Sequence, residues 1–231
     1  MAEITRRKFM GDGTVLLGSA VLAASAGGAL LPLPALAAQK NYPESSCGPE
    51  TGERKSILVA YASMSGSTGE VAEAVGRVLC GPNTTVDIRL IKNVKEVADY
   101  DGVIIGSAIR SSKWLSQAES FLKDNREKLQ KVPVAYFMTC LTLAHPGEET
   151  RRKAGAMMEP LLQEVPEVKP VGVGLFAGVL DYSKFGFAMR SVLKMKMKVA
   201  EGDYRDWEAI KAWAGEIRPL MTAARDKAKA A

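Results

Sequence analysis

Apolar runs of strand length alternate with stretches of helical periodicity from residue 56 towards the C-terminus. Five runs are predicted to be strands, at residues 56–61, 85–91, 102–107, 132–139 and 170–177. Between and after them, apolar residues recur every three or four positions, as on one face of a helix. This spacing predicts helices at 68–80, 94–99, 114–130, 148–164 with an interruption at Pro160, and 204–225 with Asp206 as its N-cap.

The order of these elements predicts an α/β fold built on a parallel sheet. The helices between strands provide the crossovers that parallel neighbours need, and they cover both faces of the sheet. The strand at 85–91 alternates polar and apolar residues, which is typical of an edge strand. We therefore expect a doubly wound, five-stranded parallel sheet in the order 2-1-3-4-5. A ligand should bind at the C-terminal ends of strands 1 and 3, beside the switch in strand order.

The N-terminal residues have the pattern of an export signal. The paired Arg6 and Arg7 precede an apolar stretch, rich in Gly and Ala, at about 14–31, and the small residues 35–37 match a cleavage site. Paired arginines with moderate hydrophobicity are typical of the twin-arginine route, so we expect residues 1–37 to be a twin-arginine signal peptide and the protein to be periplasmic or extracytoplasmic. The alternative is an uncleaved membrane helix, since the stretch approaches the ~20 residues of a span.

Composition narrows the function classes. The 231 residues, 47% of them hydrophobic, suffice for one substantial core, so we expect a linker at 38–55 and a single domain at 56–226. The formal net charge of +5 is mild and its basic residues are dispersed, which argues against a nucleic-acid partner. With a single histidine and widely spaced Cys47, Cys80 and Cys140, no metal site is expected. One disulfide is compatible with these cysteines, but no pattern selects a pair.

The segment between the first predicted strand and the first predicted helix is suited to a phosphate group. Its residues are Ser63, Met64, Ser65, Gly66, Ser67 and Thr68. Backbone N–H groups, hydroxyls and the positive end of a helix favour an anion together. The segment has no lysine and matches neither the P-loop nor the G-x-G-x-x-G pattern. We therefore expect a terminal phosphate monoester held without a metal, and the alternative is an ordinary serine-rich turn.

Three segments, in this order along the chain, resemble the flavodoxin-domain family and most closely its menaquinone-dependent protoporphyrinogen dehydrogenase branch. Residues 63–68 match the phosphate-loop pattern T-x-T-G-x-T with serine at its first, third and fifth positions. Residues 106–114 resemble that branch's loop after strand 3, and 176–182 with the later Asp206-Trp207 resemble its C-terminal region. The resemblance implies a flavodoxin-like sheet with FMN as its cofactor.

The resemblance also implies which residues contact FMN. The phosphate would bind the loop 63–68, and the ring would lie between two further loops. The residues so implied are Ser63, Met64, Ser65, Gly66, Ser67, Thr68, Ala108, Ile109, Arg110, Lys113, Trp114, Thr139, Cys140, Leu141, Thr142 and Asp181. A cation at Arg110 or Lys113 would favour the anionic reduced ring. For Trp114, the alternative to stacking on the ring is a core position at a helix start.

The resemblance implies an exported, FMN-dependent oxidoreductase that passes electrons to a quinone or another redox partner. The alternatives are a non-enzymatic electron carrier between protein partners and a protein of this fold without flavin. Residues 185–198 place Phe185 and Met189 on an apolar helical face, and Lys194 and Lys198 on a basic one. This pattern predicts either a peripheral membrane contact or a packed helix with a solvated basic side.

Overall fold

The computed structural model describes residues 41–50, 52, 54–187, 190–191, 195 and 199–223. The predicted signal peptide at 1–37 lies outside the described residues, and so does most of the predicted amphipathic segment between 188 and 198.

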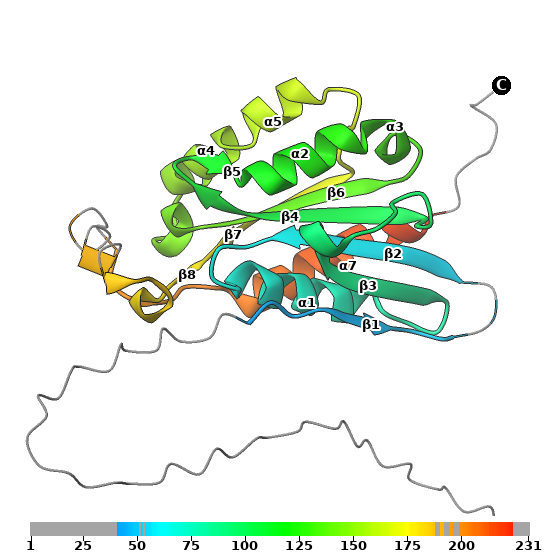
Figure 1. Ribbon diagram of the computed structural model, residues 1–231, viewed down its shortest axis with the longest axis horizontal. Coiled ribbons are helices and arrows are strands. Elements are labelled where there is room, and N and C mark those ends of the chain that lie inside the picture. The colour runs from blue at the N-terminus through cyan, green and yellow to red at the C-terminus, as the bar shows by residue number, and fades with distance from the viewer. Residues whose placement is uncertain are drawn as a thin grey trace, which may run out of the picture. The chain divides into compact units, whose positions relative to one another are not determined.

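A parallel sheet with the predicted strand order forms the centre of the domain. Among the described residues, its parallel strands are β2 (Lys55–Ala62), β3 (Thr84–Leu90), β4 (Gly102–Arg110), β6 (Val134–Cys140) and β7 (Gly172–Ala177). Their arrangement β3-β2-β4-β6-β7 confirms the order 2-1-3-4-5 (Figure 1). The switch in strand order falls at β2, because the chain adds β3 on one side of it and β4 on the other.

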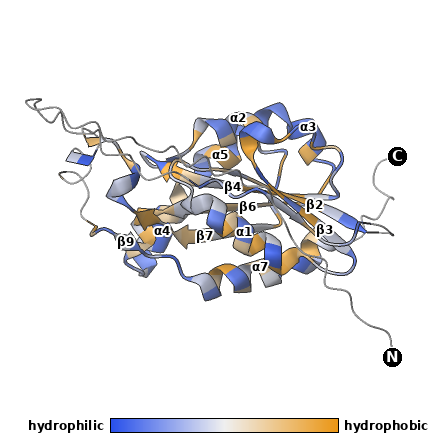
Figure 2. Ribbon diagram, turned by 60° about the horizontal axis from the view of Figure 1, so that its bottom comes forward, coloured by the Kyte–Doolittle hydropathy of each residue, from blue (hydrophilic) through white to orange (hydrophobic). Residues whose placement is uncertain are grey.

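Helices cover both faces of this sheet. They are α1 (Ser67–Leu79), α2 (Ser116–Asp124), α3 (Arg126–Leu129), α4 (Glu148–Ala156), α5 (Glu159–Glu164) and α7 (Trp207–Thr222). The α1 and α7 helices pack on one face, against residues such as Val59 and Ile104, while α2 to α5 pack on the other, against Leu58 and Ile105. The strand residues on both faces of the sheet are buried, which explains why the central strands are apolar at successive positions. Along α1 and α7, hydrophobic and hydrophilic residues alternate (Figure 2).

The edge position predicted for the second strand is wrong, because an additional strand covers it. Residues of the predicted linker form β1 (Ser45–Cys47), which pairs antiparallel with β3. A disulfide joins Cys47 to Cys80 at the C-terminal end of α1, with the two Cα atoms 6.2 Å apart. Cys140 is buried and free. The alternation in β3 therefore reflects alternate burial of its side chains and not an exposed edge.

The short helix predicted at 94–99 is absent, and a 3₁₀ turn, η1 (Ile91–Asn93), precedes turns there. The Glu96 carboxylate accepts hydrogen bonds from the backbone N–H groups of Val97 and Ala98, at 2.7 and 3.0 Å, and from Lys128 Nζ at 2.6 Å. These bonds, that of Lys128 first, lower the pKa of Glu96 to about 2. The side chain thus replaces the carbonyl partners that a helix would offer to these N–H groups.

The other predicted helices are present with shifted boundaries. The predicted 114–130 helix is divided at Asn125, whose Nδ2 donates to the Phe121 carbonyl at 2.8 Å. The predicted 148–164 helix is divided so that Pro160 falls in the first turn of α5, where no intrahelical N–H bond is lost. Asp206 caps α7 as predicted, because its Oδ1 accepts from Ala209 N at 3.0 Å.

Beyond β7 the chain forms small elements before it enters α7. They are β8 (Val179–Leu180), η3 (Tyr182–Lys184) and β9 (Gly202–Asp203), with β8 and β9 paired antiparallel. Two further small elements are β5 (Lys113–Trp114), which pairs with β4, and η2 (Leu141–Ala144) after β6. Both follow a C-terminal strand end, at the edge of the sheet where a ligand is expected.

Candidate functional site

Three loops predicted to bind FMN follow neighbouring strands and therefore lie at the same edge of the sheet (Figure 1). The pairing of Ala62 with Ser107 brings the end of β2 beside β4, and that of Ala108 with Thr139 brings β4 beside β6. Residues 63–68, 108–114 and 139–142 are far apart in the sequence. The pairing of the parallel strands brings these three loops together at one edge of the sheet.

The predicted phosphate loop is closed by one of its own hydroxyls. Ser63 Oγ accepts a hydrogen bond from Gly66 N at 2.9 Å, and Gly66 has a φ of 100° directly before α1. The Gly66 carbonyl then accepts from Gly69 N and Glu70 N at 2.8 and 3.3 Å, which starts the helix. The first N–H groups of a helix have no partner within it, so the start of α1 offers donors and a partial positive charge to an anion.

Thr68 and Thr139, two of the predicted cofactor residues, are in contact with each other. Both side chains are buried, and their Oγ1 atoms lie 2.8 Å apart. A hydroxyl carries a single proton, so this bond uses the donor of one of the two. The bond ties the start of α1 to the end of β6. Besides these threonines, the loop offers to an anion its backbone N–H groups and the hydroxyls of the half-buried Ser63, Ser65 and Ser67.

The second loop is a tight hairpin that carries two predicted cations. β4 pairs with β5 so that Arg110 lies opposite Lys113, and both side chains are exposed. The connecting Ser111 and Ser112 have φ values of 51° and 62°, as the residues of a two-residue hairpin turn require. Two like charges on one hairpin raise the local positive potential. The hairpin therefore suits a neighbouring anionic group.

Ser107 orders this hairpin and was not among the predicted site residues. Its side chain is fully buried at the end of β4. Its Oγ accepts from Leu115 N at 3.0 Å and donates to the Ala108 carbonyl at 2.8 Å, so that it spans the base of the loop. A hydroxyl at the end of an apolar strand is the sequence signal that could have identified it.

The Trp114 ring lies in the core. It is 4% exposed, packs edge-on against Tyr136 with centroids 5.8 Å apart, and its Nε1 donates to Met158 Sδ at 3.1 Å. The structure therefore favours the core alternative for this side chain over a stacking partner. Ala108 and Ile109, before the turn, are half-buried.

The third loop holds a thiol that stays neutral. Cys140 is 5% exposed, and burial raises the pKa of its thiol. Its carbonyl accepts from Gly178 N at 3.1 Å, which joins the loop to the end of β7. The half-buried Leu141 and Thr142 begin η2. A thiol with a raised pKa is a poor nucleophile, so its place at the site is one of packing.

Asp181 caps a turn in this structure. Its Oδ1 accepts from Ser183 N at 2.8 Å and from Ser183 Oγ at 2.5 Å, at the N-terminus of η3. The hydrogen bonds from Ser183 lower the pKa of this carboxyl. The Asp181 carboxylate therefore caps η3 in the structure, and this cap competes with the predicted contact to the cofactor.

Arg205 binds the backbone of the phosphate loop, and the sequence did not identify it as a site residue. Its Nη1 donates to the Ser67 carbonyl at 3.3 Å and to Glu70 Oε2 at 2.7 Å, and its Nε and Nη2 bind the two carboxylate oxygens of Asp203 at 2.8 and 2.6 Å. The guanidinium lies 4.4 Å from the centroid of Trp207, and the side chain is 7% exposed. Burial opposes its charge, but the bonds to Asp203 and Glu70 outweigh that effect and raise the pKa of Arg205. No periodicity distinguished it from a solvated arginine.

Metal binding and membrane spanning find no support in the part of the chain that the structure describes. It contains no group of three His, Cys, Asp or Glu residues placed to hold a metal ion. No helix within it is both long and apolar enough to cross a membrane. The exposed His145 contacts the Tyr204 ring, with centroids 6.4 Å apart.

The donor set of the three loops fits FMN. The start of α1 and its serine hydroxyls match a phosphate monoester without a metal. The loops after β4 and β6 begin at adjacent strand ends, and the hairpin between β4 and β5 adds the cations Arg110 and Lys113. These features belong to one edge of the sheet.

A match to the flavodoxin domain family covers residues 58–206, which is more than half of the chain. Two similar proteins are both named protoporphyrinogen IX dehydrogenase [quinone]. The one from Escherichia coli (strain K12) is 25% identical over 173 residues, covering 71% of this chain and 94% of that protein. The one from Leishmania major is 27% identical over 184 residues, covering 75% and 79%.

Solved structures with a similar arrangement include an archaeal flavodoxin and an oxidoreductase from Corynebacterium diphtheriae. The first is 18% identical with a TM-score of 0.43, over 73% of this chain and 99% of that one. The second is 14% identical with a TM-score of 0.48, over 75% and 100%.

Proposed function

Because the chain belongs to the flavodoxin domain family, we propose that it is an FMN-dependent oxidoreductase that delivers electrons to a quinone or another redox partner. The observation that carries the proposal is the meeting of three loops at one sheet edge beside the start of α1. Bound FMN would supply the electron transfer chemistry.

The residues of this chain bind and orient the cofactor. Backbone N–H groups at the start of α1, with Ser63, Ser65 and Ser67, hold the phosphate. The Arg110 and Lys113 side chains favour negative charge on the reduced ring. The buried Thr68–Thr139 bond and the buried Ser107 hold the ends of the three loops in fixed positions.

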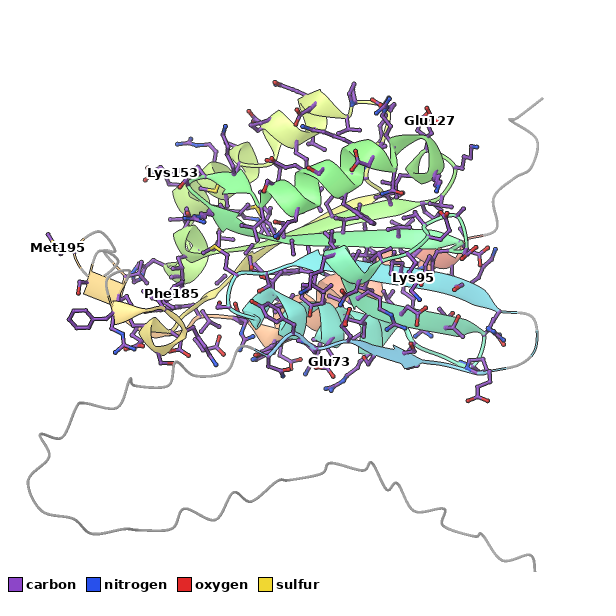
Figure 3. All side chains as sticks on the ribbon, viewed as in Figure 1. Glu73, Lys95, Glu127, Lys153, Phe185 and Met195 are labelled. Carbon is purple, nitrogen blue, oxygen red and sulfur yellow. A yellow bond between two sulfur atoms is a disulfide. The ribbon has the colours of Figure 1, made fainter. Side chains whose placement is uncertain are left out.

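A quinone is the acceptor that we propose in preference to a protein. The names of the two relatives specify a quinone, and this supports the choice. Among the described residues after β8, Phe187 and Met195 are 86% and 88% exposed, and Met195 lies away from the sheet (Figure 3). Exposed apolar residues next to the basic residues of 185–198 suit a peripheral contact with an anionic membrane, where a quinone resides.

Flavin content and acceptor preference test the proposal. The purified mature protein should release FMN on denaturation, and the reduced protein should be reoxidised by a menaquinone analogue far faster than by a small protein acceptor. The reverse preference would favour the electron carrier. A colourless protein that takes up no added FMN would leave only the flavin-less alternative.

Vesicle binding tests the membrane contact. The protein should sediment with anionic vesicles at low salt and be released at high salt. Each basic residue near the membrane contributes ~1 kcal/mol of electrostatic attraction, and salt screens this attraction. Replacing Lys194, Lys196 and Lys198 together by Gln should abolish this binding. If binding and quinone turnover survive the triple change, residues 185–198 are ordinary packing.

Export by the twin-arginine route is also part of the proposal. A disulfide such as Cys47–Cys80 supports it, because cytosolic thiols are kept reduced. Replacing Arg6 and Arg7 by Lys should leave the protein cytoplasmic with residues 1–37 uncleaved. Unchanged secretion would rule out this route.

A further inference from the structure

Residues 41–47, which we call the strap, run from the phosphate loop to the far end of α1. The strap precedes the family match at 58–206 and lies within the predicted linker. Its contacts with the phosphate loop and with the end of α1 indicate a role at the cofactor site.

The N-terminal part of the strap lies directly on the phosphate loop. The Asn41 carbonyl is so close to Gly66 that a Cβ at Gly66 would collide with it. Tyr42 Oη donates to the Met64 carbonyl at 3.1 Å. A neighbouring bond runs from Tyr61 Oη to the Pro43 carbonyl at 3.0 Å. The strap thus restrains the loop from outside, through its backbone.

The middle of the strap is bound to the ends of β3 and η1. Glu44 Oε1 accepts from Leu90 N at 2.8 Å, and its Oε2 accepts from Asn93 Nδ2 at 2.9 Å. The Ser45 carbonyl accepts from Arg89 Nη1 at 2.7 Å. Ser46 Oγ also accepts from Arg89 Nη2 at 2.7 Å and donates to Asp87, and the backbone of the strap pairs with the sheet over the three residues of β1. So short a strand holds weakly by itself.

The C-terminal end of the strap is covalently fixed. The Cys47–Cys80 disulfide has a sequence separation of 33 and encloses β2, the whole phosphate loop and α1. The two cysteines are half-buried, so a small dithiol can reach them. The strap is therefore tied to α1 at Cys80 and lies over the start of the same helix at Gly66.

We propose that the strap is a cofactor clasp whose closure depends on the Cys47–Cys80 disulfide, so that the oxidised protein retains FMN more tightly than the reduced protein. The inference rests on the proposed function of the site. Opening takes two electrons and two protons from a dithiol, which becomes a disulfide, and leaves two thiols on the protein.

The reason is local unfolding. Without the covalent tie, the strap is held by three strand residues, a few exposed or half-buried hydrogen bonds and the packing of the half-buried Tyr42 and Cys47 against the core. Segments with so few buried contacts belong to the low-stability end of a protein structure. When the strap opens, the Met64 carbonyl loses the Tyr42 donor and Gly66 loses its contact with Asn41, so the loop samples conformations that do not bind phosphate. The apparent affinity for FMN then equals the intrinsic affinity multiplied by the fraction of molecules whose loop can still bind phosphate.

Flavin fluorescence titration of the apoprotein tests the clasp. Reduction by dithiothreitol should weaken FMN binding about 10-fold, corresponding to a competent fraction of about one tenth. The Cys47→Ser/Cys80→Ser double variant should bind like the reduced protein in either condition. Riboflavin, which lacks the phosphate, should respond much less. Equal FMN affinity of the oxidised and reduced wild type would overturn the proposal.

A tyrosine pair separates the strap contact from general destabilisation. Tyr42→Phe removes the donor to Met64 and should weaken FMN about 5-fold in the oxidised protein. The matched control is Tyr136→Phe, which removes a phenol-to-carbonyl bond to Val168 away from the loop and should leave FMN affinity unchanged. Equal loss in both variants would count against the strap.

Hydrogen exchange on the apoprotein distinguishes failure of the clasp from failure of the proposed cofactor. Backbone amides of residues 63–69 should exchange faster after reduction, while those of β6 should not change. This result is independent of flavin, so failure to bind FMN would contradict the proposed function only. Unchanged exchange at 63–69 would overturn the clasp even if FMN binds.

Discussion

At the scale of single residues, the site depends on buried polar side chains that have hydrogen-bond partners. Thr68 with Thr139, Ser107 with the backbone of its loop, and Arg205 with Asp203 each fix a loop end from the protein side. Groups of this kind are costly to leave unpaired, so their removal should be felt in stability as well as in binding.

Replacing Arg205 by Met should destabilise the protein and loosen the phosphate loop. The change leaves Asp203 and Glu70 without their shared partner, and because both carboxylates are partly exposed we expect a loss of about 1–3 kcal/mol in the free energy of unfolding. Denaturant unfolding measures it. The control is Arg77→Met, which breaks an exposed pair with Glu73 on α1 and should cost no more than about 0.5 kcal/mol. Equal losses would mean that burial of Arg205 is unimportant.

The Asp203–Arg205 bond should also give a stability that depends on pH. The hydrogen bond from Arg205 lowers the pKa of Asp203 below its ordinary 3.8, so the carboxylate stabilises the fold above that value. Its contribution should disappear as the pH falls through the lowered pKa. Unfolding curves of wild type and Asp203→Asn should therefore differ at pH 6 and converge towards pH 2. A constant difference would assign the effect to packing.

At the scale of elements, the phosphate site is a turn whose shape is set by Gly66 and by the start of α1. The positive φ of Gly66 and its contact with Asn41 both exclude a side chain there. The serines on either side contribute hydroxyls to a backbone cradle that the turn has already formed.

Replacing Ser65 by Ala should weaken FMN about 10- to 150-fold, because a donor to a charged group is worth about 1.5–3 kcal/mol. Riboflavin affinity should hardly change. Thr68→Ala should differ from Ser65→Ala, because Thr139 would lose its buried partner and the melting temperature should fall as well. Fluorescence titration with both flavins, together with thermal melts, separates the two variants. Equal sensitivity of FMN and riboflavin to Ser65→Ala would place the phosphate elsewhere.

At the scale of the whole molecule, the added strand β1 and its disulfide close one edge of the sheet, and the segment after β7 extends the edge that carries the site. The segment after β7 lies within the family match at 58–206, and β1 lies before it. Both segments contact or adjoin the proposed cofactor loops, and loops at such an edge are where binding residues of a domain concentrate.

Cysteine labelling should report this architecture directly. In the native oxidised protein, iodoacetamide should modify no cysteine, because Cys140 is buried with a raised pKa and the other two are bonded. Unfolding without a reductant should expose Cys140 alone, and unfolding with reductant should expose all three cysteines of the sequence. Mass spectrometry counts the labels. Modification of Cys47 or Cys80 before reduction would contradict the disulfide.

Local periodicity was sufficient to predict the strands, most helices and the strand order, and the residue types of 63–68 indicated a phosphate loop. Apolar runs require burial between two helical layers, and chain order with right-handed crossovers then leaves few arrangements. The loops at 108–114 and 139–142 were expected at the site from the resemblance to the flavodoxin-domain family, and they lie beside 63–68 because they follow strands whose C-terminal ends share one edge.

Tertiary structure decided the contacts that have no local signal. The helix expected at 94–99 was lost to the Glu96 side chain, and the linker became a strand because β3 offered it an open edge. Arg205 reaches Ser67, and Cys47 reaches Cys80, only after the sheet has brought distant segments together. Such pairings depend on where the chain returns in space, which neither periodicity nor residue type encodes.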